Sequence, residues 1–303
     1  MSRRKNVSRH EVSHYEGPEV KSLKPGSLRY IWKKVSHNGG AMVGLTAVLL
    51  IIVSSLLSPV ILKHDYATVN IPMRYAKPSA EHWMGCDELG RDIMARVLYG
   101  ARFTLSIGFI SVFIQATLGV TLGAIAGFFG KKVDAVIMRF LDVFQAFPQI
   151  LLAIALSAAL GTGLDKCILA LGIAGIPHFA RMMRANILTI RSLEYIEAAT
   201  SINCSRFRII RRHLIPNAFS PIIVQISMSI AGAGLAASAL SFIGLGVQPP
   251  QPEWGAMLAS ARNYIRDYPH MVIIPGVFIM ITVLSFNLIG DAIRDALDPR
   301  LKD

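Results

Sequence analysis

Apolar residues fall in long runs without a charged side chain, separated by short segments rich in Lys and Arg. Five of these runs reach the roughly 20 residues that a helix needs to cross a bilayer. The run Cys167–Ala180 has only 14 residues, but Lys166, Arg181 and Arg184 extend it to 19 if their charged ends reach the interface. The pattern predicts an all-α integral membrane protein with six transmembrane helices. The runs are Ala41–Leu62, Phe103–Gly130, Val143–Leu164, Cys167–Ala180, Leu214–Pro252 and Tyr268–Gly290.

Composition supports this prediction. The 303 residues are 53% hydrophobic and 17% charged, with a mean hydropathy of +0.48, whereas about 25% of the residues in a soluble domain are charged. A disordered protein, a fibrous protein and an ordinary soluble enzyme are therefore excluded. The net charge of +12 raises the question of a nucleic-acid partner. The basic residues lie in the segments between the spans and form no compact basic domain, so no nucleic-acid partner is expected.

The basic residues instead indicate topology. Of the 31 Lys and Arg residues, 22 lie in segments that six spans would place on the side of both termini, and 9 lie on the other side. This is the positive-inside bias, so both termini are expected in the cytoplasm of a multi-pass cell-membrane protein. The first apolar run follows a polar tail and is long enough to span, which predicts an uncleaved anchor.

These features divide the chain into five parts. The tail is expected to be disordered up to about Ser27 and then to form a short interfacial helix from Leu28. The parts are a cytoplasmic tail at 1–40, a first transmembrane helix at 41–62, an extracytoplasmic segment at 63–102, a five-helix core at 103–290 with a cytoplasmic loop at 191–216, and a cytoplasmic tail at 291–303.

Several residues within the spans carry packing information. Gly119, Gly123 and Gly127 share one helical face and allow a close helix neighbour, either within the chain or in another subunit. Arg139 and Asp142 have the spacing of a mutual salt bridge. Four prolines in or beside the last four spans can kink helices: Pro148, Pro177, Pro221 and Pro275.

The loop 191–216 has the pattern of two short helices joined by a turn. Ser192 is placed to cap the first helix, which runs through Glu197 and ends at Ile202. Asn203 suits a left-handed stop, and Ser205 is placed to cap the second helix.

In that second helix Phe207, Ile210 and Leu214 form an apolar stripe, and Pro216 is expected to close it. The pattern therefore predicts a compact helix–turn–helix at the membrane surface.

This loop resembles the EAA loop of ABC-importer permeases. The matching residues are Glu197-Ala198-Ala199, then Asn203 in place of the usual glycine, then His213-Leu214-Ile215-Pro216. Three further stretches resemble the dipeptide/oligopeptide/nickel branch of that family: GCDELGRDIMARVLYGAR at 85–102, SFIGLGVQPPQPEWGAML at 241–258 and NLIGDAIRDALDPRLK at 287–302.

The resemblance implies a type I ABC-importer permease fold and an assembly of five parts. This chain would be the C-type permease, paired with a non-identical sister permease, two ABC ATPase subunits and an extracytoplasmic solute-binding protein. The EAA element would be the coupling helix, with Glu197, Ala198, Ala199, Asn203 and Pro216 at the ATPase contact. The two sizeable outer segments, Lys63–Arg102 and Ser241–Pro269, would receive the binding protein, with support of the gate as an equal alternative.

The residues proposed for that contact are Asp87, Arg91, Asp92 and Trp254. Within 85–102 the charged residues are close enough for local ion pairs. Leu89, Ile93, Val97 and Leu98 are spaced for an amphipathic helix against the membrane.

No catalytic or cofactor site is expected in this chain. A P-loop requires Gly-x4-Gly-Lys-[Ser/Thr], and the nearest stretch, Gly130-Lys131-Lys132, lacks both the hydroxyl residue and the leading glycine. ATP and Mg would therefore be bound by the ATPase partners. His10-Glu11-Val12-Ser13-His14 fits the zinc-protease pattern, but it stands in a polar tail with no catalytic domain around it.

Two questions stay open at this stage. A stand-alone channel or ion-coupled transporter is the rival class, although such proteins carry ionisable groups deep in their spans and these charges crowd the span ends. The substrate is taken as a di- or oligopeptide, with nickel, glutathione or opines as alternatives. The eight histidines show no cluster outside the spans and the three cysteines fall in three regions, so neither predicts a metal site.

Overall fold

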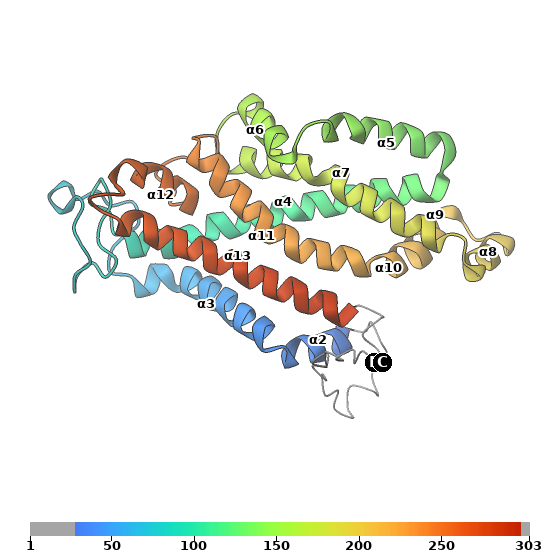
Figure 1. Ribbon diagram of the computed structural model, residues 1–303, viewed down its shortest axis with the longest axis horizontal. Coiled ribbons are helices and arrows are strands. Elements are labelled where there is room, and N and C mark those ends of the chain that lie inside the picture. The colour runs from blue at the N-terminus through green and yellow to red at the C-terminus, as the bar shows by residue number, and fades with distance from the viewer. Residues whose placement is uncertain (1–27, 298–303) are drawn as a thin grey trace, which may run out of the picture.

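The computed structural model describes residues 28–297 as a bundle of helices with irregular segments at its two ends (Figure 1). Five helices in this range are long and apolar enough to cross a membrane, and a bent pair makes a sixth if it counts as one span. The five are α3 (Gly39–Ile61), α4 (Ile93–Phe129), α7 (Leu164–Ile190), α11 (Ser220–Phe242) and α13 (His270–Leu297). The expected tail at residues 1–27, with its HExxH match, and residues 298–303 lie outside the described residues.

The remaining helices are short. They are α2 (Leu28–His37), η1 (Ile71–Met73), α5 (Lys131–Gln145), α6 (Gln149–Leu160), α8 (Glu194–Ser201), α9 (Arg206–Ile209), η2 (Ile210–Leu214), α10 (Ile215–Ala218), α12 (Trp254–Ala261) and η3 (Arg262–Tyr264).

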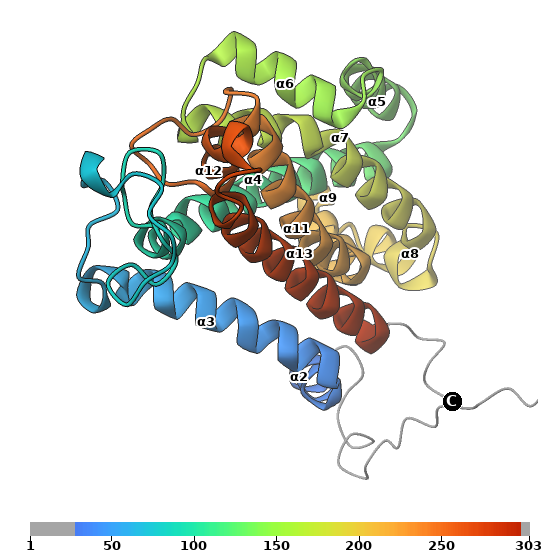
Figure 2. The ribbon, with the colours of Figure 1, turned by 60° about the vertical axis from the view of Figure 1, so that its left-hand side comes forward.

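The span expected at Val143–Leu164 is wrong as a single helix. Helices α5 and α6 meet at a bend of 83°, and both lie along α7 (Figures 1 and 2). The bend falls at Ala146–Pro148, because proline disfavours a helical conformation at the residue before it. The 12 residues of α6 extend about 18 Å, which is well short of a hydrocarbon core of about 30 Å.

Helix α4 begins at Ile93, earlier than the expected end of the extracytoplasmic segment. The segment expected at 63–102 ends at Asp92, whose side chain accepts a hydrogen bond from the Ala95 amide at 2.7 Å and caps α4. Ile93 and Val97 are buried inside the bundle at 1% and 0% exposure. The amphipathic helix expected against the membrane is therefore the buried first part of α4.

The pairing of α4 with α7 is the most extensive in the bundle. A Cβ added at Gly123 would lie 2.2 Å from the Ala180 carbonyl oxygen, and one at Gly119 would lie 2.5 Å from the Phe179 Cβ. The stripe of Gly119, Gly123 and Gly127 thus packs against α7 of the same chain. Of the two alternatives, a neighbour within the chain is therefore the one observed. Because 61% of the most apolar window of α7 is buried, this span tolerates the lowest hydropathy of the five.

The charged residues near the end of α7 pair with α5 rather than reaching outward. Arg184 binds both carboxylate oxygens of Asp134, and Arg181 pairs with Asp142. The salt bridge expected between Arg139 and Asp142 is therefore wrong, because Asp142 faces a nearer arginine on a neighbouring helix.

At the other edge of the bundle α2 packs on the end of α13. Val35 of α2, Ala41 of α3 and Ala292 of α13 share one small core. Helix α13 continues to Leu297, so the tail expected to begin at residue 291 starts at least seven residues later. Trp32 of α2 is 58% exposed.

Candidate functional site

Helices α8 and α9 and the turn between them form a hairpin, called here the 194–209 hairpin. It lies at one end of the long axis, at the same end as α2 and the last residues of α13 (Figure 1). The loops that precede α4 and the helix α12 lie at the opposite end. The loop predicted as a helix–turn–helix is thus a distinct element at the bundle's end.

The turn of the hairpin has the predicted left-handed geometry. Asn203 has a φ of +56°. After glycine, asparagine is among the residues that adopt this left-handed conformation most readily. The Cys204 amide donates to the Ala199 carbonyl at 3.1 Å and closes the turn. Ser205 caps α9 by accepting from the Arg208 amide at 3.4 Å. The cap expected at Ser192 is wrong, because the N-cap position of α8 is Leu193.

One face of the hairpin is anchored in the bundle. Ile196, Ala199 and Ile209 are exposed by only 3%, 8% and 1%, and they join the core that α4 and α7 build around Phe179 and Met183. Ala199 was expected at the ATPase contact, but its side chain points into this core. It therefore sets how closely the hairpin sits on the bundle.

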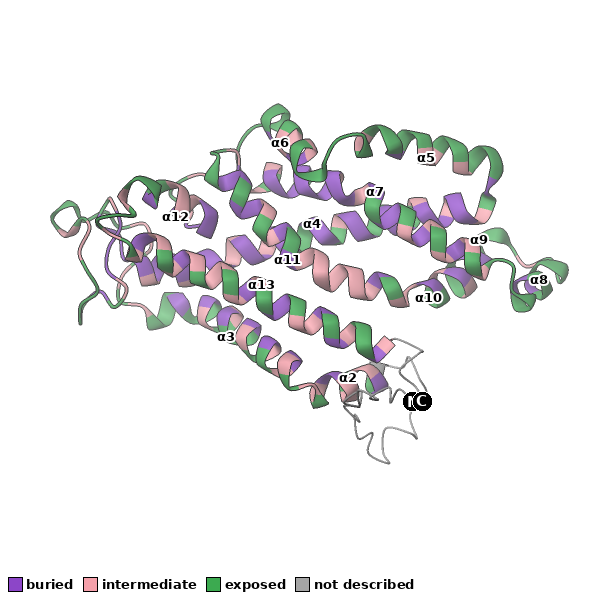
Figure 3. Cartoon of the chain, in the orientation of Figure 1, coloured by how far each residue is buried: buried purple, intermediate pink, exposed green. Residues whose placement is uncertain are grey.

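The opposite face of the hairpin is open, as the green surface of α8 in Figure 3 shows. Glu197, Ala198 and Asn203 are exposed, and two large apolar side chains stand beside them, Ile202 at 80% and Phe207 at 71% exposure. This face therefore combines a charged side chain, a small one and two large exposed apolar ones.

Two sequence expectations for this loop need correction. Phe207 was expected to share an apolar stripe with Ile210 and Leu214, but Ile209 is buried with those two residues and Phe207 is exposed. Pro216 does not close the helix, since it lies in the first turn of α10, where proline needs no amide partner. The π-helical turn η2 lies between α9 and α10 and changes which residues of the two helices share a face.

The hairpin is also tied to the end of α4. Arg191, which follows α7, donates from Nη1 to the Gly127 carbonyl at 3.0 Å. This contact joins the residue at the end of α7, just before the hairpin, to the end of α4, and the ion pairs between α5 and α7 hold the same end of α7.

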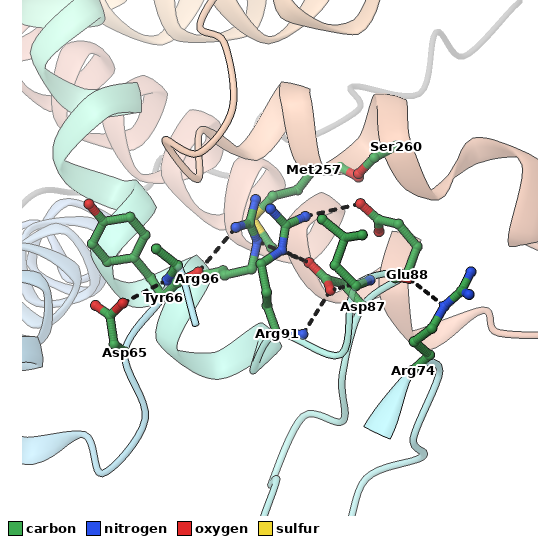
Figure 4. A network of polar contacts seen from close by, with 11 residues as sticks. Asp65, Tyr66, Arg74, Asp87, Glu88, Arg91, Arg96, Met257 and Ser260 are labelled. Atoms are coloured by element: carbon green, nitrogen blue, oxygen red, sulfur yellow. Dashed lines mark hydrogen bonds and ion pairs between the residues drawn. The ribbon is translucent and has the colours of Figure 1, made fainter. Parts of the chain in front are cut away.

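At the opposite end, charged residues of the irregular segment between α3 and α4 form a buried network (Figure 4). This segment is called here the 62–92 segment. Arg91 donates from Nε to Asp87 Oδ2 at 2.7 Å and from Nη2 to Glu88 Oε1 at 3.0 Å. Arg96 Nε lies 3.3 Å from the same oxygen of Asp87. The predicted local ion pairs are confirmed, and they hold the segment on α4.

The residues proposed for the binding-protein contact lie inside this end of the protein. Asp87, Arg91, Asp92 and Trp254 are exposed by 5%, 5%, 6% and 0%, and the Trp254 indole donates to the Val97 carbonyl at 2.9 Å. These side chains are therefore buried structural residues of this end of the bundle and are not on its surface. The contact itself stays a prediction, and Trp83 is one of the exposed side chains of the 62–92 segment, at 70%.

The 62–92 segment also brings together residues that the sequence left apart. His64, Glu81 and His82 place their potential metal-ligating atoms within 4.8 Å of one another, so the expectation that no histidines cluster outside the spans is wrong. Close by, burial raises the pKa of the Cys86 thiol to about 11, and the carboxylates of Asp92 and its neighbours add to the rise.

Comparison of the chain with known proteins shows which family it belongs to. The family described as "Binding-protein-dependent transport system inner membrane component" matches residues 119–303, and "N-terminal TM domain of oligopeptide transport permease C" matches residues 27–78. The chain belongs to this family of ABC-importer permeases. It is therefore a transport component and not a catalytic enzyme, and the rival class of stand-alone transporters is set aside.

Relatives of this permease match between 74% and 94% of its length. The dipeptide transport system permease protein DppC of Alkalihalophilus pseudofirmus is 43% identical over 285 residues, which is 94% of both chains. The glutathione transport system permease protein GsiD of Pectobacterium atrosepticum is 48% identical over 225 residues, 74% of this chain and 75% of the relative. The solved structures support the same fold.

Among them, the inward-facing MetNI methionine ABC transporter matches with a TM-score of 0.56 and 20% identity. The match covers 67% of this permease and 97% of that chain. The type I importer-permease fold is thus confirmed, and membership implies ATPase and binding-protein partners in a multi-pass membrane assembly.

Proposed function

We propose that this permease forms the translocation path of an ATP-driven importer of di- or oligopeptides together with a non-identical sister permease. The names of the relatives support peptides, because they include a dipeptide permease and a di/tripeptide permease of Pseudomonas aeruginosa that is 41% identical. Glutathione is the second candidate, since a glutathione permease is 48% identical. Nickel or opines would require the same architecture with a different binding protein.

The open face of the 194–209 hairpin is the observation that carries the coupling role. Its inner face is locked into the core of α4 and α7, while Glu197, Ala198 and the apolar Ile202 and Phe207 are left uncovered. We assign this face to one of two ABC ATPase subunits, which bind ATP and Mg. A rigid element between a motor and two spans can bias the path toward its inward- or outward-facing state.

Orientation follows from this assignment. The hairpin end, with both termini, would lie in the cytoplasm, and the 62–92 segment and α12 would face the solute-binding protein. The distribution of 22 and 9 basic residues between the two sides supports the same orientation.

The test compares two identical substitutions at neighbouring positions. Ala198→Glu adds a charge on the exposed face, and Ala199→Glu adds the same charge on the buried face. We expect Ala198→Glu and Glu197→Lys to abolish ATP-dependent peptide uptake in proteoliposomes with normal amounts of assembled protein. Ala199→Glu should lower the amount of folded protein instead, because it buries a carboxylate.

Asp165→Lys serves as the charge-matched control, since Asp165 is exposed at the opposite end of α7. Normal uptake by Ala198→Glu and Glu197→Lys together would refute the docking assignment. Uptake driven by a proton gradient without ATP would refute the proposed energy source.

A further inference from the structure

The cluster of His64, Glu81 and His82 is separate from the ion pairs of Asp87 with Arg91 and Arg96. His64 stands three residues after the end of α3, and the other two residues follow 17 and 18 positions later. Their potential ligand atoms lie within 4.8 Å of one another, and the two imidazole rings are 4.6 Å apart between centroids. The fold therefore joins two distant stretches at one point.

A buried carboxylate orients one of the two rings. His82 Nδ1 lies 2.8 Å from Asp92 Oδ2, and both side chains are 6% exposed. The other oxygen of Asp92 accepts from the Ala95 amide at the start of α4, so the carboxylate is fixed by the helix. With its Nδ1 proton donated to this carboxylate, His82 keeps a lone pair on Nε2. A carboxylate behind a histidine in this way is the usual support of a metal ligand.

We propose that His64, Glu81 and His82 bind a divalent transition-metal ion of the zinc type. Two imidazoles and one carboxylate are a donor set that favours zinc and its neighbours over magnesium or calcium. Metal–ligand bonds of about 2.0–2.1 Å in tetrahedral geometry place the ligand atoms about 3.3 Å apart. The exposed side chain of Glu81 and the half-buried side chain of His64 can close the remaining distances by rotation, and the fourth position is left for water.

The bound ion acts as a clip. It connects the residues just after α3 to Glu81 and His82 in the second half of the 62–92 segment. Because Asp92 caps α4 and also supports His82, the clip fixes the loop to the start of that helix. The ion is a structural constituent of this end of the permease, and it is distinct from the transported solute.

The experiment measures zinc binding to the purified full-length permease in detergent. The background carries His10→Ala and His14→Ala, which removes the HExxH match in the tail, and the affinity tag contains no histidine. Competition with a chromophoric chelator should give one zinc per chain. Cobalt in place of zinc should give the intense visible bands of a tetrahedral site.

The variants separate the ligands from their surroundings. His64→Ala and His82→Ala should each weaken zinc binding by at least about 100-fold, and Asp92→Asn by about 10- to 100-fold. Asparagine is as good a helix cap as aspartate, so Asp92→Asn keeps the start of α4. His37→Ala, an exposed histidine at the other end, should leave the affinity unchanged.

A measurement on the unmodified site covers the case in which a variant fails to fold. X-ray absorption of the zinc-loaded protein should show two imidazoles at about 2.0–2.1 Å. Binding that is not saturable, equal affinity in His82→Ala, or a zinc shell without imidazole would each overturn the proposal. In that outcome His82 and Asp92 are an ion pair only.

Discussion

Substituting Gly123 by alanine tests the packing of α4 on α7. An alanine Cβ at this position would lie 2.2 Å from the Ala180 carbonyl oxygen and 2.9 Å from the Met183 Cβ, whereas ordinary contacts begin at 3.4 Å. Neither of these atoms is the end of a flexible side chain. The two helices must therefore move apart by about 1 Å, because a packed interior has no free volume to absorb the methyl group.

The cost follows from that displacement. Overpacking by one methyl group typically destabilises a core by about 1–3 kcal/mol, and a gap of up to 1 Å already forfeits a quarter to a half of the dispersion energy of the atoms beside it. For a chain of this size about 1 kcal/mol corresponds to roughly 2 °C in Tm. We expect Gly123→Ala to lower Tm by about 2–6 °C.

The assay is thermal unfolding of the isolated permease in detergent, without the sister subunit. Gly232→Ala is the matched control, because it makes the same change in α11 where no atom lies within 4 Å of the added Cβ. Alanine in an exposed helix is favoured over glycine by about 0.8–1 kcal/mol. The control should therefore keep or slightly raise Tm.

Equal Tm values for Gly123→Ala and Gly232→Ala would refute this packing. A loss of stability that appears only after the sister subunit is added would also refute it, because the glycine stripe would then serve a contact between subunits.

Three further predictions concern the hairpin and the opposite end. Asn203→Ala should lower Tm because its positive φ costs alanine about 1–2 kcal/mol, whereas Asn203→Gly should not; equal losses would refute the strain. Maleimide labelling at about pH 8 should be slower at Cys86 than at Cys204, and faster labelling of Cys86 would contradict its burial. Since burial raises the pKa of Cys86 from 9.0 to about 11, its thiol stabilises the fold below about pH 9, and this contribution is lost as the pH rises toward 11. Glu253→Ala should lower Tm by about 2–6 °C, because the buried hydroxyls of Thr104 and Ser238 lose their hydrogen-bond acceptor. Glu253→Gln keeps an acceptor oxygen and should lower Tm by less. Equal Tm values for the two variants in the unfolding assay would contradict this account.

The hairpin shows how far local chemistry can be predicted from sequence. The left-handed turn at Asn203 and the cap at Ser205 depend on only a few neighbouring residues, and both are confirmed. The outward position of Phe207 was missed, because the π-helical turn that follows changes which residues share a face. Ala199 was expected at the ATPase contact because the resemblance implied it, and its burial could not be predicted locally because distant helices make the core that it joins.

The buried ends of the bundle could not be predicted from spacing. The residues around Asp87 were expected to pair locally, and they do. Their burial depends on α12 and α13 closing over them, and those helices lie more than 150 residues away in the chain. No local signal in the sequence reports that distance.

The membrane-spanning class, the approximate spans and the hairpin could be predicted from local sequence, because hydropathy and short-range hydrogen bonding act over one helix or one turn. The bend between α5 and α6, the pairing of Asp142 with Arg181 and the proximity of His64 to His82 emerged only from the folded arrangement. These features depend on which helices pack together, and packing is a property of surfaces that the chain brings together only after it has folded.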